Sequence, residues 1–259
     1  MGLIANIRSY AVFDYLKAKL CDDSEKDSYV ISSDVLSATQ FGAPQKRMRF
    51  VVMGIRKSIT DKVGFPEGKF KKGPFRTVED AIKDLEDVEP VFNVSDDKYG
   101  IKLCKKTGLS DLAQSLSDTN ILYNHIITKT TDVAMERFMA LEQGQNFHSL
   151  SDELKTNTYT DISRTQNTIY LRLKYNEPSG TVVNVRKSMW VHPTKNRAIS
   201  IREAARLQTF PDSFVFCGTK DKQYQQVGNA VPPIMAKAIA EKLAIQLSKA
   251  LDAKTREDS

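Results

Sequence analysis

The stretch QFGAPQKRMRFVVMGI, residues 40–55, places a Gly-x-Pro turn directly before a glutamine and three cations, and then continues into an apolar segment. The segment at 50–55 is continuous enough to predict a strand that is buried on both faces of a mostly parallel sheet. Gln45, Arg47 and Arg49 alternate along the chain, so in an extended segment they project to one face and could grip one anionic ligand. The plainer alternative is a strand end that carries ordinary solvated charges.

The composition bounds the kind of protein. The 259 residues are 41% hydrophobic and 27% charged, which is enough for a sizeable core in one large or two smaller domains. The net charge of +6 permits nucleic-acid binding without demanding it. The three cysteines stand far apart and none has a metal-ligand spacing, so we expect no zinc site, no disulfide framework and a reducing, intracellular compartment. No segment is long and apolar enough to predict a membrane span.

Local patterns predict the elements of the first ninety residues or so. Apolar residues at helical spacing indicate a helix over 9–20, and 29–31 is expected to form a short strand. Thr77, with Asp80 three residues later, resembles a capping box. This pair predicts the start of a short helix.

The middle of the chain, about 87–190, is polar and weakly periodic, which indicates an inserted, loop-rich region. One helix stands out in it. Thr131 or Asp132 is expected to cap this helix, and Gly144 is expected to lie near its end.

The C-terminal third is more regular. Ser200 and Glu203 form a capping box, and Pro211 is expected to stop the helix that they start. Val-Gly-Asn at 227–229 is expected to be a tight strand-to-helix turn whose backbone can approach a ligand closely. Two prolines that suit a first helical turn follow, and the helix beyond them carries an apolar stripe of Ile239, Leu243 and Leu247.

Three segments, in this order, resemble the motifs of a known family. LSATQFGAPQKRMRF, RAISIREAARLQTFPDSF and QVGNAVPP are similar to motifs VIII, IX and X of the DNA cytosine-5 methyltransferases. The resemblance implies an α/β fold, in which the C-terminal part of a Rossmann-like, S-adenosylmethionine-dependent methyltransferase sheet joins a smaller, loop-rich α+β domain for DNA recognition. It divides the chain into the end of the catalytic domain (1–86), a target-recognition domain (87–225, with motif IX at 197–211), and motif X with a terminal helix that packs back on the catalytic domain (226–259).

The resemblance also implies roles for individual residues. Gln45, Arg47 and Arg49 would line the pocket of the flipped cytosine, because a guanidinium offers several donors at once to a carbonyl oxygen or a phosphate. Thr181 and Val182 fit the position of a Thr-Leu/Ile/Val pair that the family carries near the target base, shortly before motif IX. The remaining residues form a scaffold of paired charges in the recognition domain (Arg202, Glu203 and Arg206) and a border of the S-adenosylmethionine pocket (Gly228, Asn229 and Val231).

The family's catalytic motifs are absent from this sequence. The family attacks C6 of cytosine with the cysteine of a Pro-Cys-Gln loop, contacts the ring with the glutamate of Glu-Asn-Val, and binds the cofactor with a Phe-x-Gly-x-Gly loop. Cys21, Cys104 and Cys217 follow leucine, leucine and phenylalanine instead of proline. The resemblance therefore implies that this chain cannot carry the covalent catalysis of the family by itself.

We accordingly expect the C-terminal portion or subunit of a DNA cytosine-5 methyltransferase, either as a truncated chain or as one polypeptide of a split enzyme. The implied partners are double-stranded DNA and the missing N-terminal half. S-adenosylmethionine would bind only in the complete enzyme, no metal and no membrane are expected, and the setting would be the cytoplasm of a bacterium. The alternative is a non-catalytic DNA-binding or regulatory protein derived from the same family, against which the intact pocket residues argue.

Overall fold

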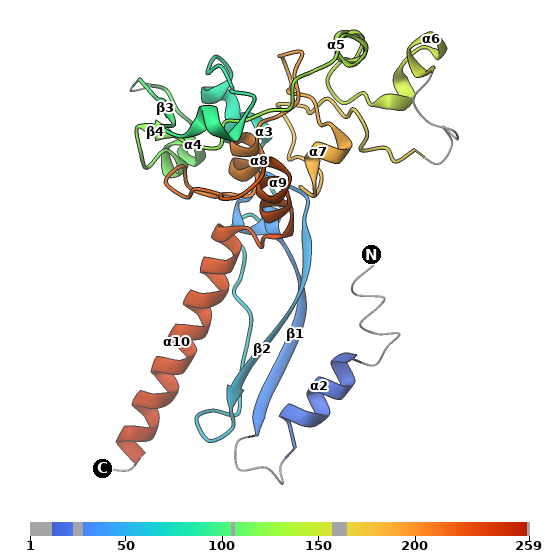
Figure 1. Ribbon diagram of the computed structural model, residues 1–259. Helices are drawn as coiled ribbons and strands as arrows, with labels where there is room; N and C mark the ends of the chain where they lie inside the picture. The colour runs from blue at the N-terminus through green and yellow to red at the C-terminus, as the bar shows by residue number, and fades with distance from the viewer. Residues whose placement is uncertain (1–11, 23–27, 105–106, 157–164, 258–259) are drawn as a thin grey trace.

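The computed structural model describes residues 12–22, 28–104, 107–156 and 165–257. Short helices and loops gather into a head, from which a two-stranded hairpin and one long helix project in the same direction (Figure 1). The hairpin consists of β1 (Tyr29–Ser37) and β2 (Met48–Arg56), and the long helix is α10 (Pro233–Glu257). The order of the chain therefore places both its early and its last elements beneath the head.

The hairpin corrects the strand prediction. β1 pairs with β2 antiparallel, from Tyr29 opposite Arg56 to Ser37 opposite Met48. Only Met53 and Ile55 of β2 are buried, so the strand is not covered on both faces. A parallel pair needs a crossover of about a dozen residues or more, and the short link at 38–47, which begins with the 3₁₀ turn η1 (Ala38–Phe41), allows only a hairpin.

The first strand is also longer than the sequence pattern predicts, because the polar residues of its second half pair with β2 instead of ending the strand. A helix, α2 (Val12–Leu20), lies beside this hairpin, and the rings of Phe13 and Phe50 meet edge to face with centroids 5.4 Å apart. The predicted helix over 9–20 is confirmed over 12–20. Its first residues, 9–11, lie outside the part that the structure describes.

The head is built from short elements, as the weak periodicity predicts. Most of its helices have fewer than nine residues, and its strands β3 and β4 pair antiparallel over two residues each. In chain order the elements are α3 (Val78–Ile82), η2 (Lys83–Leu85), η3 (Val94–Asp97), β3 (Ile101–Lys102), α4 (Asp111–Leu116), β4 (Ile121–Leu122), α5 (Asp132–Met139), η4 (Phe147–Ser149), α6 (Asp152–Lys155), α7 (Val185–Ser188), α8 (Ile201–Leu207) and α9 (Lys220–Asn229).

One helix, α8, forms the centre of the head, and all seven of its residues are buried. Its apolar side chains share a core with α3, α4 and α9, and Trp190 is the largest side chain in that core. A smaller cluster around Phe138 and Phe147 supports α5. The main core thus runs from 78 to 227, and it includes α3, which the predicted domain boundary at 86 assigns to the catalytic part.

The predicted helix starts are confirmed. Thr77 and Ser200 both form complete capping boxes, in which the side chain three residues later reaches back to the cap. The predicted helix ends are less accurate. α5 ends at Met139, before the turn that Gly144 makes with φ of 87°, and α8 ends at Leu207, well before Pro211.

The Val-Gly-Asn segment corrects a second prediction. It is the last turn of α9 and does not follow a strand, so it is not a strand-to-helix turn. The helix was missed because KDKQYQQV is almost entirely polar and carries no apolar stripe. Glycine is still needed at 228 because another backbone segment packs closely against it: a Cβ there would lie 2.7 Å from the backbone carbon and oxygen of Val183.

The base of α10 packs against the base of the hairpin. Met235 is fully buried in a cluster with Ala38 and Phe41. Farther out, the loop after β2 follows the helix, because the Gly64 backbone N–H donates to Oε1 of Gln246 at 2.7 Å. The predicted stripe of Ile239, Leu243 and Leu247 is half-buried.

Candidate functional site

Gln45 lies at the point where three distant segments meet. Its side-chain amide donates to the carbonyl oxygen of Leu207 at 2.9 Å and to Oε1 of Gln208 at 2.7 Å. Its own Oε1 accepts a hydrogen bond from the backbone N–H of Val182 at 3.2 Å. The side chain is fully buried, so these bonds fix the turn before β2 against α8 and against the segment around Val182.

Arg47 closes the same junction from the next alternate position. Nη1 donates to the carbonyl oxygen of Val182 at 2.7 Å, and Nη2 donates to those of Gly228 at 2.9 Å and Ala230 at 2.8 Å. The residue is only 1% exposed, and no described carboxylate forms an ion pair with it. Arg47 thus directs both Nη groups at backbone of this chain, and only its buried Nε lacks a partner among the described residues.

Arg49 differs from the other two members of the alternating set. It is half-buried, and its guanidinium donates to the carbonyl oxygen of the neighbouring Met48 at 2.9 Å. Burial lowers the pKa of Arg49. The alternation itself is present, since Lys46 and Met48 are exposed between the more buried Gln45, Arg47 and Arg49. Of the three predicted pocket residues, Arg49 has the most donors left for a ligand.

The predicted Thr181–Val182 pair lies directly beside this strand. Thr181 donates through Oγ1 to the carbonyl oxygen of Lys46 at 2.7 Å. Val182 is fully buried and uses both of its backbone polar groups on Gln45 and Arg47. The structure therefore brings together the predicted motif VIII residues and a pair that stands 135 residues later in the chain.

The charged residues of the predicted motif IX lie inside the head, behind this junction. Arg206 binds Asp212 through two bonds of 2.9 and 2.5 Å and also reaches Asp84 at 2.5 Å. Arg202 donates to the carbonyl oxygens of Tyr123 at 2.8 Å and Phe214 at 2.7 Å, and burial lowers its pKa to about 10. Both guanidinium groups are fully buried, which leaves neither of them accessible to DNA.

Glu203 organises the other side of α8. It accepts two hydrogen bonds from Arg197, at 2.8 and 2.7 Å, and a third from the backbone N–H of Ser200 at 2.7 Å. Burial acts to raise the pKa of Glu203, but Arg197 outweighs it and the net shift is downward. Nε2 of His192 lies 3.7 Å from the carboxylate, yet burial lowers the pKa of His192 to about 4. The histidine is therefore neutral at pH 7.

The predicted cofactor residues lie at the end of α9, in the case of Gly228 and Asn229, and in the turn that follows it, in the case of Val231. Gly228 is buried against the Val183 backbone, and its carbonyl oxygen accepts a hydrogen bond from Arg47. Asn229 and Val231 are exposed. The two exposed side chains are thus available to a ligand, whereas Gly228 is committed to packing.

Sequence reasoning missed several residues that hold the junction and the head. Gln208 connects Gln45 to the carbonyl oxygen of Val227, to which its Nε2 donates at 2.7 Å. It belongs to the Arg-Leu-Gln run that carries the motif IX resemblance, so its position was a usable signal. Arg172, which donates to the carbonyl oxygens of His192 at 2.9 Å and Phe138 at 2.5 Å, stands in no pattern that marks it.

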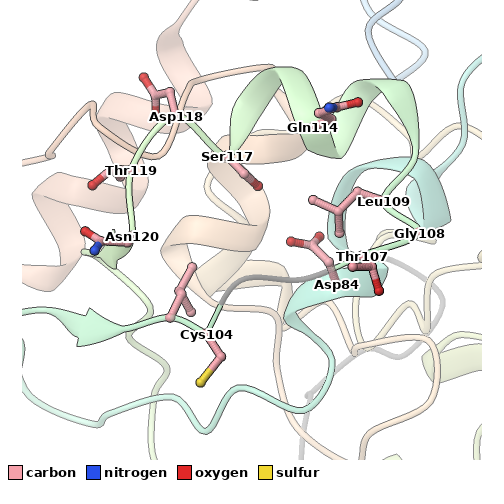
Figure 2. A pocket seen from close by; sticks show the side chains of 11 residues that line it. Asp84, Cys104, Thr107, Gly108, Leu109, Gln114, Ser117, Asp118, Thr119 and Asn120 are labelled. Atoms are coloured by element: carbon pink, nitrogen blue, oxygen red, sulfur yellow. The ribbon is translucent and has the colours of Figure 1, made fainter.

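A hollow on another side of the head, between η2, α4 and the segment after β3, is lined by residues that include Asp84, Cys104 and Asp118 (Figure 2). Asp84 is bound to Arg206, and Asp118 accepts a hydrogen bond from the backbone N–H of Ser213 at 2.9 Å. The sulfur of Cys104 points away from the other labelled side chains (Figure 2). No histidine, lysine or arginine is among the described residues that line the hollow.

Within the part of the chain that the structure describes, no group of His, Cys, Asp and Glu side chains could hold a metal ion. No described helix is long and apolar enough to cross a membrane.

Comparison with known proteins identifies the family. The family profile described as C-5 cytosine-specific DNA methylase matches residues 13–244, which is most of the chain. The chain belongs to this family, and the predicted resemblance is confirmed at that level.

Two curated relatives and one solved structure illustrate the match. The chain is 27% identical to the type II methyltransferase M.DdeI of Desulfomicrobium norvegicum over 89% of its own length and 58% of the relative. It is 30% identical to M1.HphI of Haemophilus parahaemolyticus over 87% of the chain and 50% of the relative. A crystal structure described as a prophage-encoded DNA modification methyltransferase (E. coli) matches 96% of the chain and 66% of its own, with 26% identity and a TM-score of 0.68. The fold is thus the α/β fold of DNA methyltransferases, and the chain spans little more than half the length of these curated relatives.

Proposed function

We propose that this chain is the DNA-recognition half of a DNA cytosine-5 methyltransferase of a bacterial restriction-modification system. In this proposal a separate or preceding N-terminal half supplies the nucleophilic cysteine, the Glu-Asn-Val glutamate and most of the S-adenosylmethionine pocket. The cysteines of this chain support the division of labour, because none stands in a Pro-Cys-Gln setting. The substrate is double-stranded DNA.

The junction at Gln45 and Arg47 is the observation that carries the proposal. It joins the turn before β2, the Thr181–Val182 pair, the end of α8 and the turn after α9 through buried hydrogen bonds. These are the segments that resemble motifs VIII, IX and X. Their convergence supports a shared site at which Arg49 and Thr181 remain partly exposed.

Arg49 is the residue proposed to hold the flipped cytosine. A half-buried guanidinium keeps fewer waters than an exposed one, so its hydrogen bonds to the O2 carbonyl of the base or to a phosphate of the DNA backbone are stronger. Gln45 and Arg47 act one step away in this proposal, because they position β2 and the Thr181 segment without touching the base. Lys46 is exposed on the opposite face and is not part of the pocket.

The motif IX charges are proposed as the scaffold that keeps the head rigid around the site. Arg202, Glu203 and Arg206 are fully buried and each binds partners from at least one other segment. A buried charge network of this kind costs much free energy if one partner is removed, so it specifies one arrangement of the loops. The predicted limits of the recognition domain, 87–225, remain part of this proposal.

The residues at the turn before α10 fit one edge of a cofactor site. Asn229 and Val231 are exposed at a turn whose backbone Arg47 holds in place through the carbonyl oxygen of Ala230. An amide and an aliphatic side chain could border S-adenosylmethionine, which supplies the methyl group when it is bound. The buried Gly228 shapes the turn from behind.

Reconstitution tests the proposed function. The chain alone should transfer no methyl group from labelled S-adenosylmethionine to DNA, and mixing or co-expressing it with a polypeptide that carries the three missing motifs should restore transfer. Methylation by the purified chain alone would refute the division of labour. No transfer by the mixture would favour the alternative, a non-catalytic DNA-binding or regulatory protein of the same family.

A matched pair of variants tests the pocket within the reconstituted enzyme. Arg49→Ala should lower methyl transfer about ten- to a hundred-fold, because a lost charge-assisted hydrogen bond costs about 1.5–3 kcal/mol. Lys46→Ala, three residues earlier on the opposite face, should change the rate less than about twofold, since exposed charges contribute little. Thermal unfolding of both variants controls for loosening of β2. Equal, small effects of the two substitutions would show that Arg49 is an ordinary charge at a strand end and would refute the pocket.

A further inference from the structure

A second hollow lies between the start of α5, the short helix α7 and α9, with a volume of about 660 Å³. Its floor is apolar and includes Phe138 and Met189. Cations stand around it: Lys129, Arg186, Lys187 and Lys222. Among the residues that the structure describes, no lysine or arginine lines the hollow near Cys104, where Asp84 and Asp118 do.

The rim keeps most of its positive charge. Asp221 is the one carboxylate among the lining residues, and it pairs with Arg186. Lys129, Lys187 and Lys222 are exposed and form no ion pair with any residue that the structure describes. Three unpaired ammonium groups therefore face solvent around one concave site, which attracts a polyanion.

Two polar atoms of the residues that line this hollow have no partner in the described part of the chain. Oγ1 of Thr128 and Oδ1 of Asn184 are buried, and neither makes a hydrogen bond to any described residue. Buried polar atoms are nearly always satisfied, so an unmet pair in one hollow points to a bound molecule that completes them. The Thr128 hydroxyl can donate to an anionic oxygen, and a half-turn of the Asn184 amide places its N–H₂ group at the same spot.

The hollow is a short distance from the proposed base pocket. Arg186 follows Thr181 by five residues, which span at most about 17 Å of extended chain. Duplex DNA rises about 3.4 Å per base pair, so Arg186 lies within about five base pairs of a cytosine held at Thr181. The carbonyl oxygen of Gly228 accepts a hydrogen bond from Arg47, and Gly228 also packs closely against the backbone of Val183 and Asn184. Gly228 therefore connects the two sites.

We propose that this hollow, bordered by Lys129, Lys187 and Lys222 and containing Thr128 and Asn184, holds backbone phosphates of the DNA that flanks the target cytosine. The inference rests on the proposed function, because it takes DNA as the ligand. Lysine, threonine and asparagine side chains are common donors to phosphate, and such contacts fix the register of a protein on the duplex. The apolar floor packs against deoxyribose and keeps water from the buried donors.

Salt-dependent DNA binding tests the rim. The chain carrying both Lys187→Gln and Lys222→Gln is titrated with a fluorescent duplex of mixed sequence over a range of salt concentrations. Each phosphate contact that is lost lowers the slope of log affinity against log salt by about 0.9, so we expect a decrease of about 1.8 from wild type. Lys249→Gln, at an exposed position on α10, is the matched control and should keep the wild-type slope within about 0.3.

A second variant separates a ligand contact from a structural role. Thr128→Val keeps the shape of the side chain but removes the unmet hydroxyl, so the folded chain should unfold about 2–4 °C higher. DNA affinity should fall about tenfold, because a hydrogen bond to phosphate is lost. A hydroxyl with only a structural role would lower the unfolding temperature and leave affinity unchanged.

The outcomes distinguish this inference from the proposed function. If the wild-type chain fails to bind duplex DNA at low salt, the proposed function is refuted and the phosphate site with it. If the wild-type chain binds DNA but the double variant keeps the wild-type slope, or Lys249→Gln lowers the slope as much, the phosphate site is refuted and the proposed function stands.

Discussion

Replacement of Arg47 by alanine should unfold the junction more than it affects any ligand directly. Arg47 supplies the donors for the carbonyl oxygens of Val182, Gly228 and Ala230, and two of these bonds are buried. A buried acceptor without a partner costs about 1–3 kcal/mol, so the three together give about 3–5 kcal/mol once water reaches the more open one. At about 2–4 °C per kcal/mol for a chain of this size, the unfolding temperature should fall by about 10 °C.

The chain contains a convenient probe for this measurement. Trp190 is the only tryptophan in the sequence and is fully buried in the core of the head, so its fluorescence reports unfolding there. Arg49→Ala is the matched control: the same truncation two residues later should cost less than about 1 kcal/mol, because among the described residues the Arg49 side chain bonds only to its neighbour Met48. Arg47→Lys should recover little, since an ammonium group cannot span three carbonyl oxygens as the guanidinium fork does. An Arg47→Ala protein that unfolds within about 2 °C of wild type would refute the reasoning.

Three further predictions follow from the head. Gly228→Ala should lower the unfolding temperature by several degrees, because its Cβ would lie 2.7 Å from the Val183 backbone. Thermal melting followed by circular dichroism measures the decrease. Gly218→Ala is the comparison, because a Cβ there is not crowded and only the φ of 96° causes strain. His192 has a pKa of about 4 in the folded chain and about 6.5 in the unfolded chain. Because the unfolded chain binds the extra proton, the free energy of unfolding should fall by up to about 3 kcal/mol as the pH drops from 6.5 to 4. Urea unfolding of wild type and His192→Gln across that pH range tests this, and parallel curves would contradict it. Exchange of residues 87–190 for those of a relative with another specificity should move methylation to the relative's site in the reconstituted enzyme, and an active hybrid that keeps the original site would disprove the boundaries.

The sequence by itself determined the features that depend on neighbouring residues. The capping boxes at Thr77 and Ser200 need only side chains three residues apart, and both are present as predicted. The start of the helix α10 follows from the two prolines at 232–233. The ordered segments indicated the family, and the match over 13–244 confirms the family. The alternation at Gln45, Arg47 and Arg49 was also readable, because residues two apart share one face of an extended segment.

Only the tertiary structure decided what these side chains bind. The partners of Arg47 stand 135 to 183 residues away, and no local pattern distinguishes a guanidinium that holds backbone from one that waits for a ligand. The pairing of β2 with β1 and the close contact of Gly228 with the Val183 backbone were likewise visible only in the folded chain. The physical reason is the same throughout, since burial and hydrogen-bond partners come from segments that only folding brings together.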